Sequence, residues 1–116
     1  MYNFKSLVQK KLEYISVGTI EELLDGQKLF VEVDDLPIVI MNVAGQYYAI
    51  ADVCSHDDGP VGEGNIEGFE IICPRHGARF DIRTGRALAL PAFVDIPVYP
   101  VRLLGDEIEI GIPTDQ

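Results

Sequence analysis

Apolar and polar residues alternate along two parts of the chain, and this period of two predicts β-strands. The predicted strands span residues 12–17, 29–33, 38–43, 46–50, 96–104 and 107–110. Two-residue turns separate neighbouring strands at Asp34-Asp35, Ala44-Gly45 and Gly105-Asp106. Turns of this length join antiparallel strands. The pattern therefore predicts an all-β fold, a small antiparallel β barrel or sandwich.

One short helical turn is expected between the first two strands. Thr19 and Glu22 have the spacing of a capping box, and Gly26 supplies a stop signal. Residues 1–11 are polar and irregular, and we expect them to form a tail outside the fold.

Residues 52–85 interrupt the strand pattern. They contain six glycines and two prolines, and their apolar runs are as short as Ile71-Ile72. Such a segment is typical of loops held by a metal centre rather than by an apolar core. We therefore expect a single domain, residues 1–116, in which a binding subdomain of about 52–86 is inserted into a basal β part of about 12–51 and 87–112.

The charge of the chain restricts its partners. Nineteen acidic residues against nine basic ones give a formal net charge of −10 in 116 residues. Nucleic acid and anionic membranes would be repelled, so neither is expected as a partner. A protein with a basic docking face is one interpretation, and a charge that only maintains solubility is the other; both stay open.

We expect a cytoplasmic protein. Residues 1–14 contain no apolar segment of a signal peptide. The longest apolar stretch, residues 36–44, is interrupted by Pro37 and Asn42 and is far too short to span a membrane.

Every cysteine and histidine of the chain lies in one of two short segments. Cys54 and His56 are separated by one residue, and Cys73 and His76 by two. The order Cys, His, Cys, His differs from that of a zinc finger, in which cysteines pair with cysteines. Two facing loops would put both thiolates at one end and both imidazoles at the other, as two adjacent metal ions require. A Cys54–Cys73 disulfide and a mononuclear zinc site remain as alternatives, but a disulfide would leave both histidines unexplained.

The two segments resemble the Rieske motif C-x-H…C-P-x-H-G-x-x-F-D. Residues 54–56 read Cys-Ser-His, sixteen residues follow, and residues 73–81 read Cys-Pro-Arg-His-Gly-Ala-Arg-Phe-Asp. Residues 84–86 (Thr-Gly-Arg) and 90–92 (Leu-Pro-Ala) are also similar to that family. In size and spacing the chain resembles the Rieske ferredoxins of bacterial aromatic-ring oxygenase systems, over about residues 12–112.

The resemblance implies one [2Fe–2S] cluster per chain, with Cys54 and Cys73 on the buried iron and His56 and His76 on the outer one. It implies a monomeric one-electron carrier, not an enzyme, that relays electrons from an NAD(P)H-dependent flavoprotein reductase to a terminal oxygenase. The alternative is a non-catalytic small subunit of a larger redox enzyme, such as an assimilatory nitrite reductase. Those subunits commonly lack the ligands that this chain retains.

Departures from the quinol-oxidising Rieske proteins predict a low potential. Gly59 and Arg75 stand where those proteins have a second cysteine pair, and Ala78 and Phe80 stand where they have hydroxyls that donate to sulfur. Fewer donors to sulfur lower the potential, which we predict to be about −150 mV. Gly59 and Gly77 are expected to let backbone N–H groups approach the cluster sulfides.

Four of the five arginines fall within twelve residues, at positions 75, 79, 83 and 86. They would either give this end of the molecule a local positive charge or pair with Asp57, Asp58, Glu63 or Asp81. We expect a structural role for Arg79.

Overall fold

This computed structural model describes residues 11–114 of the chain. They contain eleven strands and one 3-10 turn. The basal strands are β1 (Lys11–Thr19), β2 (Lys28–Val33), β3 (Leu36–Val43), β4 (Gln46–Ala51), β9 (Val98–Tyr99), β10 (Val101–Leu104) and β11 (Glu107–Thr114). The remaining strands are β5 (Ile66–Glu67), β6 (Glu70–Ile72), β7 (Arg79–Asp81) and β8 (Ala87–Ala89). All pairings are antiparallel, which confirms the predicted fold class.

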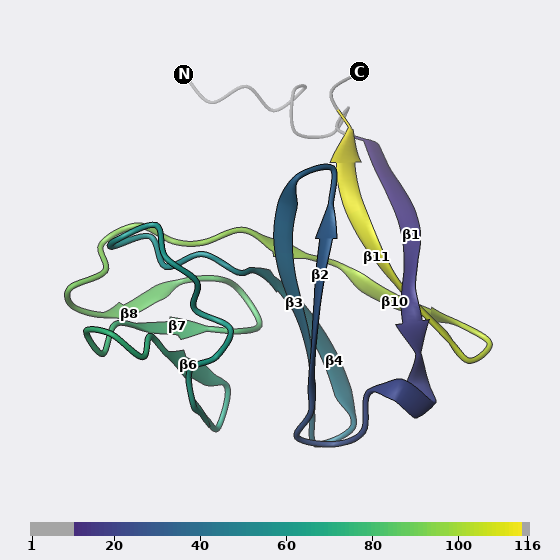
Figure 1. The fold of residues 1–116 in the computed structure, drawn as a ribbon, viewed down its shortest axis with the longest axis horizontal. Coiled ribbons are helices and arrows are strands. Elements are labelled where there is room, and N and C mark those ends of the chain that lie inside the picture. Colours follow the sequence, from purple (N-terminus) through teal and green to yellow (C-terminus); the bar gives the residue numbers. More distant parts are fainter. Residues whose placement is uncertain (1–10, 115–116) are drawn as a thin grey trace.

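The strands form three sheets, with the orders β1-β11-β10, β2-β3-β4-β9 and β5-β6-β7-β8. Figure 1 shows β2, β3 and β4 in the middle of the molecule, the first sheet on one side and the third sheet on the other. A shared apolar core joins the first two sheets, and it includes Ile38, Ile40, Ile108 and Ile110, all at most 1% exposed. These side chains alternate along β3 and β11, so the period of two accounts for the basal fold.

The predicted hairpins are confirmed. Asp34 and Asp35, between β2 and β3, both have positive φ angles of 50° and 66°. Ala44 and Gly45, between β3 and β4, have φ angles of 55° and 86°. Positive φ at both central residues is the geometry of the tight turn that fits the twist of a hairpin.

The prediction of a single strand over residues 96–104 is wrong. The structure has two strands there, and they belong to different sheets. β9 pairs with β4, whereas β10 pairs with β11. Pro100 lies between them and has no N–H to continue a ladder, while its carbonyl accepts a hydrogen bond from Gly111 (2.9 Å). The chain therefore changes sheets at Pro100 and connects the two halves of the basal fold.

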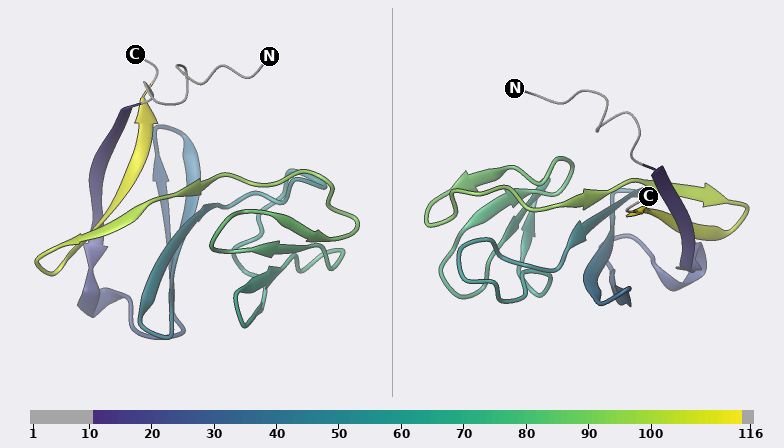
Figure 2. Two further views of the ribbon diagram at one scale, coloured as in Figure 1. Left: turned by 180° about the vertical axis from the view of Figure 1, so that it is seen from behind. Right: turned by 90° about the horizontal axis from the view of Figure 1, so that it is seen from above.

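The expectation that residues 52–85 lack an apolar core is also wrong. Ile71, Phe80 and Ile82 are at most 1% exposed and pack with Cys54 and Cys73 in a second core cluster. The strands of this sheet are only two or three residues long, too short for an alternating pattern. β8 completes the sheet just past residue 86 by pairing with β7. The views in Figure 2 show these strands beside the basal sheets rather than between them.

The expected helical turn is present as a 3-10 turn, Ile20–Glu22. The Glu22 carboxylate accepts a hydrogen bond from the backbone N–H of Thr19 (2.8 Å), as a capping box requires. Of the expected tail, residues 1–10 lie outside the described residues, and Lys11 begins β1. Between residues 11 and 114 there is no helix of the length and apolarity that crossing a membrane requires.

Candidate metal centre

Two loops contain the cysteines and histidines. The first Cys-His loop, residues 52–65, leads from β4 to β5, and the second, residues 73–78, joins β6 to β7. In the first loop the Cys54 N–H donates to the Gly59 carbonyl (2.7 Å). In the second the Cys73 N–H donates to the Ala78 carbonyl (2.7 Å). Each cysteine therefore begins a turn closed by backbone hydrogen bonds, which fixes the direction of its side chain.

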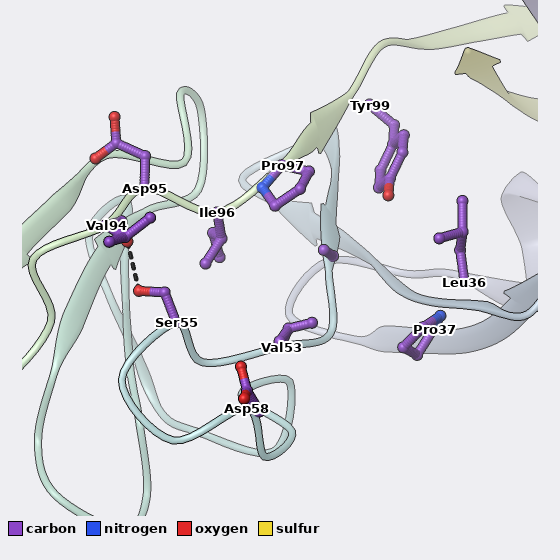
Figure 3. A pocket seen from close by; sticks show the side chains of 11 residues that line it. Leu36, Pro37, Val53, Ser55, Asp58, Val94, Asp95, Ile96, Pro97 and Tyr99 are labelled. Atoms are coloured by element: carbon purple, nitrogen blue, oxygen red, sulfur yellow. Dashed lines mark hydrogen bonds between the residues drawn. The ribbon is translucent and has the colours of Figure 1, made fainter. Parts of the chain in front are cut away.

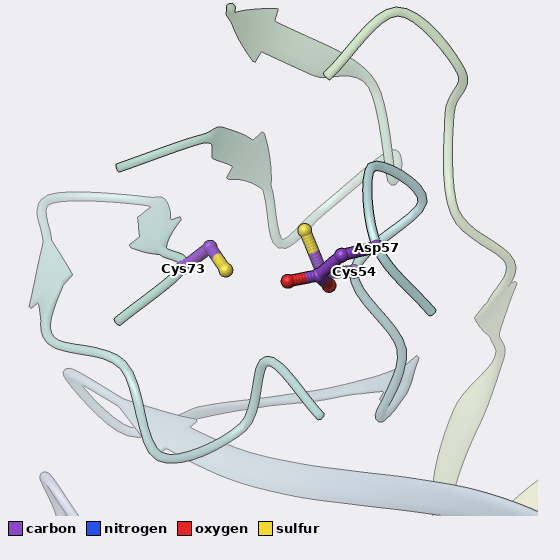
Figure 4. A group of neighbouring side chains, drawn as sticks. All are labelled: Cys54, Asp57 and Cys73. Atoms are coloured by element: carbon purple, nitrogen blue, oxygen red, sulfur yellow. The ribbon is translucent and has the colours of Figure 1, made fainter. Parts of the chain in front are cut away.

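The two thiols face each other inside the molecule. Cys54 and Cys73 are free thiols, 0% and 1% exposed. Their Sγ atoms and one carboxylate oxygen of Asp57 all lie within 4.8 Å of one another (Figure 4). The structure thus brings together the two predicted sulfur ligands and adds the Asp57 carboxylate, which is not one of the predicted ligands.

The two imidazoles lie side by side at the surface. The ring centroids of His56 and His76 are 5.2 Å apart, and the ring planes are nearly perpendicular, at 88°. Both residues are exposed, and the His76 side chain is 55% accessible. Buried sulfur and exposed nitrogen are therefore separated, as the facing-loop hypothesis predicts.

Burial raises the pKa of the Cys54 thiol above its ordinary value, because the charged thiolate loses its hydration. The neighbouring Cys73 thiol adds to this effect. Backbone hydrogen bonds from His56 and Asp57 act in the opposite direction, since they stabilise the thiolate. A bound cation would have to supply the rest of the compensation that keeps this sulfur ionised.

The prediction that Gly59 and Gly77 make room for backbone N–H groups beside the cluster stays a prediction, but the N–H groups of these two glycines are not themselves such donors. The Gly59 N–H donates to the Asp57 carboxylate (3.0 Å), and the Gly77 N–H donates to the Cys73 carbonyl (3.0 Å). Both donors are therefore used within their own loops. The N–H groups of His56 and Asp57 reach the Cys54 sulfur, and no sequence signal distinguishes them, because every residue except proline carries an N–H.

Three of the four clustered arginines, Arg75, Arg79 and Arg83, form ion pairs. Arg79 contacts Glu67 (3.1 Å) and Glu70 (3.3 Å), which confirms its structural role. Arg75 contacts Asp57 (2.6 Å), and hydrogen bonds from Arg75 hold the pKa of that carboxyl well below its usual range. The acidic partner of Arg75 thus lies directly beside His56 in the sequence.

An apolar pocket of about 340 Å³ adjoins the first Cys-His loop (Figure 3). Val53, Val94 and Ile96 line it, and Asp58 is also part of its wall. The Ser55 hydroxyl donates to the Val94 carbonyl, so this hydroxyl is not directed at a sulfur. The segment that carries Val94 also exposes apolar side chains, of which Phe93 is 82% accessible.

The donors present fit a [2Fe–2S] cluster of mixed ligation. Two soft sulfur donors lie inside and two imidazoles lie outside, which is the division between the two irons of a Rieske centre. The closed backbone turns hold the donors of each loop on one side of the molecule.

Comparison with known proteins agrees with this geometry. Residues 13–100 match the family described as "Rieske [2Fe-2S] domain". The ferredoxin component of biphenyl 2,3-dioxygenase from Rhodococcus jostii (strain RHA1) is 38% identical over 91 residues, which cover 78% of this chain and 85% of that protein.

Solved structures are similar as well. The ferredoxin of carbazole 1,9a-dioxygenase from Nocardioides aromaticivorans IC177 has a TM-score of 0.79 at 32% identity, covering 84% of this chain and 95% of that one. A chain in the complex of reduced oxygenase and oxidized ferredoxin in carbazole 1,9a-dioxygenase has a TM-score of 0.78 at 28% identity, covering 84% and 91%. The match to the family and the 38% identity are decisive, and the chain belongs to the Rieske [2Fe-2S] domain family.

Proposed function

We propose that this chain is a one-electron carrier that delivers electrons to a terminal oxygenase. The observation that carries this proposal is the separation of two buried thiols from two exposed imidazoles at one end of the molecule. An electron must leave through a group that a partner can approach closely, and the accessible edges of His56 and His76 provide such a group.

In this proposal Cys54 and Cys73 hold the inner iron of the cluster, and His56 and His76 hold the outer iron. When bound, a cluster with this ligand set takes up and releases one electron at a higher potential than an all-cysteine cluster. The protein excludes water from the sulfur side, because both cysteines are at most 1% exposed.

No residue of the site is arranged for bond-making catalysis. Ser55, the hydroxyl nearest to the ligands in sequence, donates to Val94, and both histidines are assigned to the metal. The relatives are ferredoxin components of dioxygenase systems, which supports a carrier and not a catalytic subunit. The same names disfavour the alternative of a nitrite reductase small subunit.

The proposed partners are a terminal oxygenase and an NAD(P)H-dependent flavoprotein reductase. The similarity to a chain in a complex of oxygenase and ferredoxin supports the first. The reductase follows from the carrier role, since the electron must come from a donor. We propose that the chain acts as a monomeric, cytoplasmic single domain, with residues 52–86 as the cluster-binding part.

The test is to purify the protein anaerobically, assay iron and acid-labile sulfide, and record the EPR spectrum after reduction with dithionite. Two irons and two sulfides per chain are expected, with the low average g value of a histidine-ligated cluster. Cys73→Ala should lose the cluster, whereas the matched control Ser55→Ala should retain it, because it removes only the hydrogen bond to Val94. Zinc instead of iron, or no metal, would contradict the proposal.

A further inference from the structure

The ion pair between Arg75 and Asp57 joins the two Cys-His loops directly. Arg75 Nε lies 2.6 Å from one carboxylate oxygen of Asp57, and Nη2 lies 2.9 Å from the other. The remaining terminal nitrogen, Nη1, donates to the Pro60 carbonyl (2.7 Å). A planar guanidinium can make all three bonds at once, because its donors are fixed in one plane, whereas an ammonium cannot match this fork.

The pair adjoins both histidines along the chain, and one Asp57 oxygen lies 3.7 Å from His76 Nδ1. Asp57 directly follows His56, and Arg75 directly precedes His76. Asp57 Oδ1 also accepts the N–H of Gly59, so the carboxylate is fixed to its own loop as well as to the opposite one. The separation of the loops next to the histidines is therefore set by these hydrogen bonds.

Gly59 provides the surface on which the guanidinium rests. A Cβ added at Gly59 would meet three atoms of Arg75 first, Nη2 at 2.8 Å, Cζ at 2.9 Å and Nε at 3.2 Å. A methyl group there would push the guanidinium away from Asp57. Since three hydrogen bonds fix the guanidinium, it cannot move aside without breaking at least one of them.

We propose that Asp57 and Arg75, the inter-loop ion pair, are positioning residues that fix the separation of His56 and His76 around the metal centre. The inference rests on the proposed function, because it concerns the loaded centre. The planar guanidinium of Arg75, and not its charge alone, keeps the two loops at a fixed separation.

The experiment compares Arg75→Lys, Arg75→Ala and Gly59→Ala in the anaerobically purified protein. The readouts are the half-life of the visible absorption band at a fixed temperature and the g values of the reduced protein. All three variants should shorten the half-life by about fivefold or more and shift the g values, because each breaks the fork. Adding Gly59→Ala to Arg75→Ala should have no further effect, since the contact is then already lost.

The matched control is the ion pair between Arg83 and Asp81, which also makes two side-chain hydrogen bonds but lies outside both loops. Arg83→Ala should leave the g values unchanged, because this pair does not connect the two loops, so any loss of half-life should come without a shift of the g values. The inference is overturned if Arg75→Lys behaves as wild type, since charge alone would then suffice, or if Gly59→Ala does. If Arg75→Ala does not fold, Gly59→Ala decides. Wild-type protein without a cluster would instead refute the proposed function itself.

Discussion

Gly64 lies where the first Cys-His loop crosses the strand that leads to Cys73, and Gly64→Ala tests how tightly the two are packed. A Cβ at Gly64 would lie 1.8 Å from the carbonyl oxygen of Ile72 and 2.8 Å from its carbonyl carbon. Ordinary contact begins at 3.4 Å, so the two backbones would have to separate by about 1.6 Å.

The loop cannot move away easily. The Gly64 N–H donates to the Val61 carbonyl (2.9 Å), and the Gly64 carbonyl accepts from the Lys28 ammonium (2.6 Å). Overpacking usually costs about 1–3 kcal/mol when side chains can adjust. Here both contacting groups are backbone, so we expect a destabilisation of about 3 kcal/mol, or about a hundredfold faster loss of structure if it appears in the unfolding rate.

Gly68→Ala is the matched control. Gly68 has a φ angle of 61°, and no atom lies within 4 Å of an added Cβ. Alanine there meets only the intrinsic cost of the left-handed conformation, about 1–2 kcal/mol.

The assay follows the visible band and the far-UV circular dichroism during incubation at one temperature. Because the displacement falls next to Cys73, Gly64→Ala should lose the visible band before its β-sheet signal. Gly68→Ala should lose both together. If Gly64→Ala is as long-lived as Gly68→Ala, the packing argument is refuted.

Three further predictions concern the surface, the potential and pH. Phe93→Ser should lower the rate of electron delivery to the oxygenase without changing the visible spectrum, because exposed aromatic side chains often anchor protein interfaces. Leu104→Ser, which changes another exposed apolar residue, on β10, should leave that rate unchanged. The midpoint potential of wild type should be about −150 mV, because Ala78 and Phe80 supply no hydroxyl that donates to sulfur. A value above about +100 mV would contradict this reasoning. Hydrogen bonds from Arg83 lower the pKa of Asp81 below 3.8, so this pair stabilises the fold above that pH. The stability difference between wild type and Asp81→Asn, measured by thermal denaturation, should therefore shrink as the pH falls below 3.8.

The basal fold could be predicted from the sequence because its information is local. The turn at Ala44-Gly45 adopts the positive φ angles that a short hairpin needs. The change of sheet at Pro100 could not be predicted, although the proline itself was visible. Which sheet each flanking strand joins depends on β4 and β11, and neither partner can be identified from the alternation within residues 96–104.

The residue types of the candidate site predicted more of it than the alternation of apolar and polar residues did. The chain has only two cysteines and two histidines, so their grouping in two short segments is a strong signal. Asp57 is one of four acidic residues that the sequence offers as partners of the arginines, and nothing in the sequence distinguishes it from the other three. Its role becomes visible only when the fold brings Arg75 within hydrogen-bonding distance. The buried core around Phe80 was missed because its strands are too short to show a period.

Side-chain hydrogen bonds hold both ends of the first Cys-His loop, and a fixed loop suits an electron carrier. The Asp52 carboxylate accepts the N–H groups of Val61 (3.0 Å) and Gly62 (2.6 Å), and Lys28 of β2 holds Gly64. The shape of this loop is therefore specified by the protein's own hydrogen bonds. A centre that gains and loses one charge reorganises least when the dipoles around it are fixed in advance. The loop that contributes Cys54 and His56 meets that requirement, and the ion pair between Asp57 and Arg75 extends it to the opposite loop.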